Sequence, residues 1–231
     1  MNIAIIPARG GSKRIPRKNI KNFHGKPIIS YSIQAAIDSK IFEKIIVSTD
    51  DEEIANVSIE YGAEVPSLRP NEISDDNTGI HPVMSYTLDL LSSQNLNFEF
   101  ACCIYATAPL IDAQDIVNGY HLIKNEDCAS VLAVAEYNYP VERSFFINNM
   151  GEIEMLFPEK FNTRSQDLNR VMHDAGQFCW ARNEIWKGPP LQFGPSHRPL
   201  ILPSWRVQDL DNQDDWVRAE LLFKLLEQSK S

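Results

Sequence analysis

The chain has 231 residues, 43% of them apolar, and it carries a formal net charge of −9. These values are typical of one large α/β domain, here residues 1–231, and the acidic balance argues against a broad nucleic-acid-binding surface. The first residues lack a charged secretory leader, and no apolar run is long enough to span a bilayer. We therefore expect a cytoplasmic protein that binds neither nucleic acid nor a membrane.

The first half of the chain predicts strands and helices in alternation. The apolar run over residues 2–8 stops at Gly10-Gly11 and is typical of a buried strand. An amphipathic helix is expected over residues 27–39, with Pro27 in its first turn, and a later helix opens on the acidic run 49–53. Further strands are expected at 44–48, 63–65, 98–106, 130–136, 177–182 and 200–203, and further helices at 79–92, 113–124 and 212–228. This alternation predicts a mostly parallel sheet with helices on both faces.

Residues 137–173 interrupt the alternation. The stretch is rich in aromatic and aliphatic side chains, yet it contains turn residues such as Asn148-Asn149 and Met150-Gly151. So many apolar residues in an irregular excursion need a surface that buries them. We expect a hairpin-like arm that packs on a second copy of the chain in a homodimer. The alternative is an arm folded back onto its own core.

A basic loop directly follows the first predicted strand. Residues 9–18 hold five cations and no acid. In open α/β sheets ligands bind beyond the carboxyl ends of strands, and glycines such as Gly10 and Gly11 let the backbone approach a phosphate. Neither the Walker pattern nor the dinucleotide pattern is present. The loop therefore predicts a site for the phosphates of a nucleoside triphosphate; the alternative is a solvated basic turn.

Near the C-terminus, Asp209 and Asp211 lie two residues apart, so on an extended segment they face the same side. Two aligned carboxylates repel unless a cation joins them, and oxygen ligands suit Mg²⁺. We expect a Mg²⁺ site here; the alternative is that Asp211 only caps the following helix and Asp209 is solvated. The cysteines match no zinc or disulfide spacing, and Cys102 and Cys103 are expected as reduced core residues.

The loop also resembles the first signature of the CMP-sialic acid synthetase family, which consists of cytidylyltransferases that act on acidic sugars. The signature spans Ile5 to Asn19, I-I-P-A-R-G-G-S-K-R-I-P-R-K-N. Later segments resemble the family in the same order over almost the whole chain: Val47-Ser48-Thr49-Asp50, Leu68-Arg69-Pro70, Asp75-Asp76-Asn77-Thr78, Thr107-Ala108-Pro109-Leu110 and Asp209-Leu210-Asp211. The resemblance implies a Rossmann-like nucleotidyltransferase fold whose dimerisation arm is residues 137–173.

The resemblance also implies roles for individual residues. CTP would be the nucleotide substrate and Mg²⁺ the cofactor, with Arg9, Lys18 and Asp211 as catalytic residues. The nucleotide would be bound by Arg9, Gly11, Ser12, Lys13 and Lys18 at its phosphates, and by Asn19, Arg69, Asp76 and Thr78 at its base and ribose. The metal would be bound by Asp209 and Asp211. The sugar would be bound by Tyr105, Arg164, Gln166, His173, Asp174 and Gln177.

The identity of the sugar depends on a shorter segment. Sialic acid enzymes usually carry Gln where this chain has Tyr105, and Arg where it has Ile111 and His173. The run from His173 to Phe178, H-D-A-G-Q-F, instead resembles the branch that activates pseudaminic acid, an acidic nine-carbon sugar. We therefore predict synthesis of the CMP-linked pseudaminic acid, with sialic, legionaminic or 3-deoxy-manno-octulosonic acid as alternative substrates. The alternative from another class is a non-catalytic nucleotide-binding protein, although the phosphate and metal residues are all present.

Overall fold

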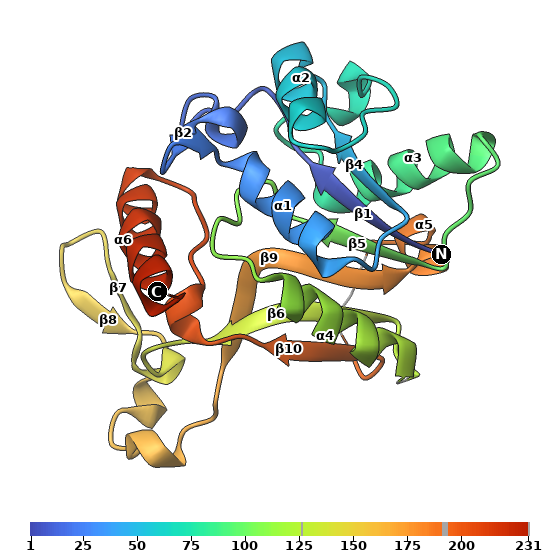
Figure 1. Ribbon diagram of the computed structural model, residues 1–231. Helices are drawn as coiled ribbons and strands as arrows, with labels where there is room; N and C mark the ends of the chain where they lie inside the picture. Colours follow the sequence, from blue (N-terminus) through green and yellow to red (C-terminus); the bar gives the residue numbers. More distant parts are fainter. Residues whose placement is uncertain (126, 191–193, 231) are drawn as a thin grey trace.

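A six-stranded sheet forms the centre of the computed structural model, which describes residues 1–125, 127–190 and 194–230 (Figure 1). β1 pairs in parallel with β4 and β5, and β10 pairs in parallel with β6, whereas β9 is antiparallel to β5 and β6. β9 runs backwards because the chain leaves the sheet at the end of β6 and re-enters at that same end. The predicted mostly parallel sheet is confirmed. Its strands follow the order β10 (His197–Ile201), β6 (Ser130–Glu136), β9 (Met172–Arg182), β5 (Phe100–Ile104), β1 (Asn2–Pro7) and β4 (Lys44–Ser48).

Helices cover both faces of this sheet (Figure 1). Alternate residues of each strand point to opposite faces, which divides the core into two clusters. A third cluster lies beside the sheet, where Trp216 packs against Phe23 with ring centroids 5.4 Å apart. One face carries α1 (Ile29–Ser39), α2 (Glu52–Glu60) and α4 (Ala113–Asn125), the other carries α3 (Ile80–Ser93) and α5 (Asn183–Lys187), and the third cluster is closed by α6 (Gln213–Lys230).

Two local expectations were wrong, and several short helices were not expected. Pro27 does not lie in the first turn of α1; it belongs to the short strand β3 (Lys26–Pro27), which pairs with β2 (Asn22–Phe23) and places Phe23 in the third cluster. The expected strand at 63–65 is a single bridge between Ile46 and Glu64. The helix α5 was not expected. Short 3₁₀ helices, also unforeseen, occur at Lys18–Ile20, Asn71–Ile73, Val141–Arg143, Pro158–Lys160, Ser165–Asp167 and Ser204–Arg206.

The arm leaves the sheet after β6 and contains a hairpin of β7 (Phe145–Ile147) and β8 (Ile153–Met155). In Figure 1 it extends away from the sheet. Its apolar side chains stay exposed, with Ile147 71% and Ile153 70% accessible. The arm is therefore not folded back onto the core of its own chain.

The cysteines of β5 and β9 lie inside the sheet. Cys102, Cys103 and Cys179 are buried, reduced thiols, as the apolar surroundings predict, and burial raises the pKa of each. Among the described residues, no helix is long and apolar enough to cross a membrane.

Candidate active site

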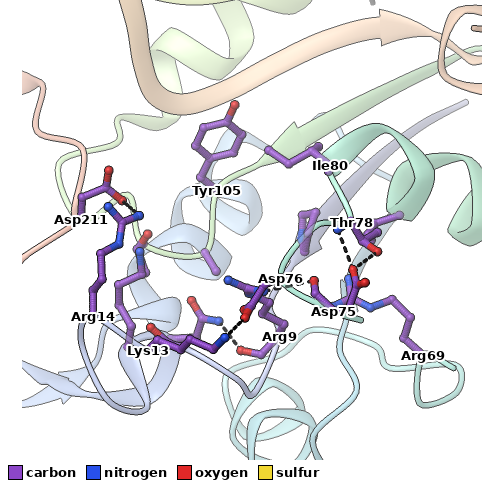
Figure 2. Close-up of a pocket in the computed structure, with 18 of the residues that line it drawn as sticks. Arg9, Lys13, Arg14, Arg69, Asp75, Asp76, Thr78, Ile80, Tyr105 and Asp211 are labelled. Carbon is purple, nitrogen blue, oxygen red and sulfur yellow. Dashed lines mark hydrogen bonds and ion pairs between the residues drawn. The ribbon is translucent and has the colours of Figure 1, made fainter. Parts of the chain in front are cut away.

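A cleft of about 500 Å³ opens at the carboxyl ends of β1 and β5, where ligands bind in α/β sheets of this kind (Figure 2). Four parts of the chain meet there: the basic loop after β1, the segment before α3, the end of β5 and the segment before α6. The residues lining the cleft are Pro7, Arg9, Ser12, Lys13, Arg14, Lys18, Asn19, Arg69, Ile73, Asp75, Asp76, Thr78, Gly79, Ile80, Val83, Tyr105, Ala106, Thr107, Asp209 and Asp211. All the predicted nucleotide and metal residues are among them except Gly11, which is exposed in the loop beside Ser12.

The basic loop is held by acids that directly follow the neighbouring strand β4. The Gly10 N–H donates to Asp50 Oδ1 at 3.0 Å. A Cβ at Gly10 would stand 2.6 Å from Asp51 Oδ2, so only glycine allows the loop to approach this closely. Further along, the Asn19 amide donates to the Arg9 carbonyl at 2.9 Å and draws the two ends of the loop together. The loop therefore has a defined shape at the mouth of the cleft.

Arg17 points away from the cleft and anchors the loop to α2. Its guanidinium donates to both Asp51 oxygens, at 2.5 and 2.9 Å, and to Glu53 at 2.5 Å. Asp51 is also the N-cap of α2 and accepts the Ile54 N–H at 3.0 Å. The hydrogen bond from Arg17 holds the pKa of Asp51 below its ordinary value of 3.8. Of the five cations in residues 9–18, four line the cleft and Arg17 serves the fold.

The cations of the cleft meet carboxylates from other segments. Arg9 Nη1 lies 2.5 Å from Asp76 Oδ1, and Lys13 forms an ion pair with the other oxygen of the same carboxylate (Figure 2). These two contacts, with Lys13 as the stronger influence, lower the pKa of Asp76. All three side chains are exposed at the cleft, where ion pairs contribute little to stability and exchange readily. Anionic phosphates could therefore replace Asp76 as the partner of Arg9 and Lys13.

The segment before α3, residues 69–79, forms one polar wall of the cleft. Asp75 Oδ1 accepts the Thr78 N–H at 2.7 Å and the Thr78 hydroxyl at 2.6 Å, which closes the turn that carries Asp76. Arg69 is buried, lies 3.7 Å from Asp50 and donates to the Ser74 hydroxyl at 3.1 Å. Its burial lowers its pKa. Asp50 thus contacts both the basic loop and Arg69, so one carboxylate joins two walls of the cleft.

Asp209 and Asp211 form the opposite wall, where Asp211 Oδ1 accepts from Arg14 at 2.6 Å. Partial desolvation in the cleft, together with the charge of Asp211, raises the pKa of Asp209, as expected for facing carboxylates. Lys18 Nζ donates to the Leu210 carbonyl at 2.6 Å. Desolvation lowers the pKa of Lys18, against the opposing effect of the two carboxylates. Two cations of the basic loop, Arg14 and Lys18, thus contact the segment that carries the aspartate pair.

The alternative in which Asp211 caps the last helix was wrong. The cap of α6 is Asn212, whose side chain accepts the N–H groups of Asp214 at 2.9 Å and Asp215 at 3.1 Å. Asp211 is consequently available to the cleft. No group of three or more His, Cys, Asp or Glu side chains suited to a metal occurs in the part of the chain that is described. Two carboxylates nevertheless suit Mg²⁺, which usually binds one or two of them and completes its shell with water and phosphate oxygens.

The predicted sugar-binding residues fall into three groups. Tyr105 lines the cleft and its hydroxyl donates to Asp174 Oδ2 at 3.1 Å, so these two lie together. Gln177 is 3% exposed, its amide nitrogen donates to the Arg206 carbonyl at 2.7 Å, and it is not among the residues that line the cleft. The other three lie on the arm or at its base: Arg164, which pairs with Asp167 at 2.7 Å, Gln166 in the same turn, and His173, whose ring lies 4.8 Å from that of Tyr137.

Sequence reasoning overlooked several residues of the cleft. Arg14 was part of the basic loop but had no assigned role, although it binds Asp211. Asp75 was part of a recognised segment and is the residue that shapes it. The apolar wall of Ile73, Ile80 and Val83 left no local signal, because it exists only once α3 packs beside the loop.

The family of the chain follows from its similarity to known proteins. A family model described as cytidylyltransferase matches residues 3–177. The chain belongs to the cytidylyltransferase family. The nucleotidyltransferase activity and the family resemblance expected from the basic loop are thereby confirmed.

Relatives and solved structures agree with this assignment. The chain is 40% identical over 228 residues to the pseudaminic acid cytidylyltransferase of Campylobacter jejuni subsp. jejuni serotype O:2, covering 99% of this chain and 98% of that protein. It is 32% identical over 218 residues to N-acylneuraminate cytidylyltransferase A of Danio rerio, covering 94% of this chain and 49% of that protein. The structure of a CMP:2-keto-3-deoxy-manno-octonic acid synthetase complexed with CTP has a TM-score of 0.70 at 14% identity, covering 99% of both chains. That last likeness shows a shared fold.

The Arg17 anchor makes a prediction about stability and pH. Replacing Arg17 with Gln should lower the free energy of unfolding by about 1 kcal/mol at neutral pH, a value that allows for solvent screening of a partly exposed pair. Because the folded pKa of Asp51 lies below 3.8, the pair stabilises the fold above that pH and loses its contribution as the pH falls through the folded pKa. Urea unfolding of both proteins at pH 7 and near pH 3.5 measures this.

The difference between the two proteins should therefore shrink on acidification. Lys26→Gln is the matched control, because Lys26 is an exposed cation in β3 at the surface. An unchanged difference between Arg17→Gln and the wild type at both pH values would contradict the role given to Asp51.

Proposed function

We propose that this enzyme couples CTP to pseudaminic acid and releases the CMP-sugar and pyrophosphate. The observation that carries the proposal is a single cleft in which four cations of the basic loop face the Asp209 and Asp211 pair, in a chain of the cytidylyltransferase family. Identity of 40% along nearly the whole length of a pseudaminic acid cytidylyltransferase supports the choice of sugar. The segment from His173 to Phe178 supports the same choice.

The reaction is a nucleotidyl transfer by one in-line displacement. The oxygen of the sugar's anomeric hydroxyl forms a bond to the α-phosphorus of CTP, the hydroxyl proton passes to solvent water, and the bond from the α-phosphorus to the pyrophosphate oxygen breaks, so that pyrophosphate leaves. Catalysis is then chiefly positioning and stabilisation of charge. Arg9 and Lys18 act as catalytic residues by offsetting charge on the phosphates, and Lys13 joins them; CTP replaces Asp76 as the partner of both Arg9 and Lys13.

The rest of the loop and the segment before α3 hold the nucleotide. Ser12 and the backbone of Gly11 bind phosphate oxygens, because both are accessible beside the cations. The base and ribose of CTP are bound by Asn19, Arg69, Asp76 and Thr78, all of which line the cleft.

Asp209 and Asp211 would hold Mg²⁺, with Asp211 as the third catalytic residue. The donor set fits, since both are carboxylates on the wall that faces the phosphate-binding cations. When bound there, Mg²⁺ lowers the pKa of the attacking hydroxyl and neutralises phosphate charge. Arg14, which is exposed, is the group that must release Asp211.

The sugar site is built from both the cleft and the arm. Tyr105 lines the cleft, and Asp174 accepts its hydroxyl and so orients it. Arg164, Gln166 and His173 belong to the arm, 137–173, within the single domain 1–231. We infer that the exposed apolar hairpin packs on a second copy of the chain, so that the arm of one subunit brings these residues to the cleft of its partner.

Pyrophosphate release from CTP tests the reaction and the sugar together. With Mg²⁺ and CTP, pyrophosphate should be released when pseudaminic acid is present and not when every acidic sugar is left out. The panel includes sialic, legionaminic and 3-deoxy-manno-octulosonic acids as competing substrates. Turnover of sialic acid with no turnover of pseudaminic acid would overturn the choice of sugar. CTP binding with no acceptor consumed would favour a non-catalytic nucleotide-binding protein.

Replacing Asp211 with Asn should reduce turnover by at least about a hundredfold, as the loss of a central charge-stabilising group does. The measurement is initial rate at saturating CTP over a range of Mg²⁺ concentrations. Asp214→Asn is the matched control, since Asp214 is an exposed acid three residues further along the chain. A near-normal rate for Asp211→Asn at saturating Mg²⁺ would refute the metal role.

The arm proposal predicts that a charge on the hairpin separates the subunits. Ile147→Glu should convert a dimer into a monomer in sedimentation experiments while the far-UV circular dichroism of the chain stays that of the folded protein, because Ile147 is exposed in the isolated fold. Asn149→Glu places the same charge at the polar turn of the hairpin and should stay dimeric. A wild-type monomer, or a dimer that tolerates Ile147→Glu, would contradict the proposal.

A further inference from the structure

The two aspartates proposed to bind the metal lie on a segment without regular structure. Residues 207–212 belong to neither a helix nor a strand. A segment of this kind has no ladder of backbone hydrogen bonds to fix its direction, so its N–H and carbonyl groups need partners from elsewhere. The relative direction of Asp209 and Asp211 therefore depends on the side chains that hold this backbone.

The carboxylate of Asp215 binds the backbone of Asp211 directly and is linked to the backbone of Asp209 through Gln208. Its Oδ2 accepts the Asp211 N–H at 3.1 Å and the Asn212 N–H at 3.0 Å. Its Oδ1 accepts from the amide of Gln208 at 3.1 Å, and the same amide donates to the Asp209 carbonyl at 2.8 Å. The backbone on either side of Leu210 is thus tied to one side chain in the first turn of α6.

Helix capping accounts for only part of this arrangement. Asn212 caps α6 and Asp215 returns a bond to the Asn212 N–H, which is the reciprocal pattern of a capping box. A cap does not require the further bonds to the Asp211 N–H or to Gln208. Those two bonds reach beyond the helix and involve the backbone of the proposed metal ligands.

Lys18 completes the support from the opposite side. Its Nζ donates to the Leu210 carbonyl, the peptide group between the two aspartates. The Asp209 carbonyl, the Leu210 carbonyl and the Asp211 N–H therefore each have a side-chain partner. Of these partners only Lys18 lines the cleft, so Asp215 and Gln208 act from behind the segment.

We propose that Asp215 is a positioning residue for the metal site, holding the backbone of Asp209 and Asp211 in register without itself binding the metal. The proposal rests on the metal role given to that pair above. It concerns geometry and not charge: what Asp215 supplies is two acceptor oxygens at a fixed place. Groups that orient metal ligands in this way typically contribute a factor of about 10 to 100 in metal affinity.

The test compares Asp215→Ala with Asp215→Asn. Mn²⁺ binding in the presence of CTP, followed by electron paramagnetic resonance, gives a readout that does not depend on turnover. Asp215→Ala should raise the Mn²⁺ dissociation constant about tenfold, and should raise the Mg²⁺ concentration for half-maximal turnover to a similar degree. Asp215→Asn keeps an acceptor oxygen for the two N–H groups and loses only the bond from Gln208, which keeps its own bond to the Asp209 carbonyl, so it should stay within about threefold of wild type.

Amide hydrogen exchange over residues 207–213 gives a structural readout, and exchange should quicken in Asp215→Ala but not in Asp215→Asn. Asp214→Ala is the matched control, because Asp214 is the neighbouring exposed acid on the same turn and should leave all three measurements unchanged. If Asp215→Ala does not fold, Gln208→Ala replaces it and should weaken Mn²⁺ binding in the same direction, since it removes the link to the Asp209 carbonyl.

Two results would overturn the proposal alone: an unchanged Mn²⁺ dissociation constant in Asp215→Ala, or equal losses in Asp215→Ala and Asp215→Asn, which would mean that charge and not geometry matters. A wild-type enzyme that transfers CMP but binds no Mn²⁺ with CTP would overturn the metal role and this proposal together. The wild-type measurement thus separates failure of the proposed function from failure of the further inference.

Discussion

Two carboxylates at the end of β4 hold the basic loop, and the shape of the whole cleft depends on them. Asp50 accepts the Gly10 N–H, and Asp51 binds Arg17 near the far end of the loop. Five cations in so short a loop repel one another unless acids lie close by. Parallel pairing of β1 with β4 brings the carboxyl ends of both strands to the same edge, and this places the acids beside the loop. Asp50 also forms an ion pair with Arg69, at 3.7 Å.

Within the cleft, cations and carboxylates form exposed ion pairs whose partners can be replaced by a ligand. Arg9 and Lys13 meet Asp76, and Arg14 meets Asp211. Exposed pairs of this kind contribute at most about 1 kcal/mol each, whereas bonds from Arg or Lys to phosphate are stronger. A triphosphate can therefore take over the cations and leave Asp211 to a metal. The pairs also limit repulsion between like charges that the fold has gathered in one place.

Much of the fold follows from local patterns, and the exceptions have physical causes. The strands at 44–48 and 130–136 and the start of the helix at 113 were predicted to the residue, because buried runs and turn residues mark them. Pro27 was misplaced because a two-residue hairpin, set by contacts of Phe23 with α6, leaves almost no periodicity. The strand β9 begins at Met172 and not near residue 177, because pairing with β6 extends it.

By itself the sequence determined the alternation of strands and helices, the chemistry of the basic loop and the family, since these depend on residue types that are close together in the chain. Only the tertiary structure decided which charges meet. Arg14 and Asp211 are 197 positions apart, Lys18 reaches Leu210 across 192, and Arg17 turns out to serve the fold and not the cleft. Such pairs are set by the packing of distant segments against one sheet, and no local pattern carries that information.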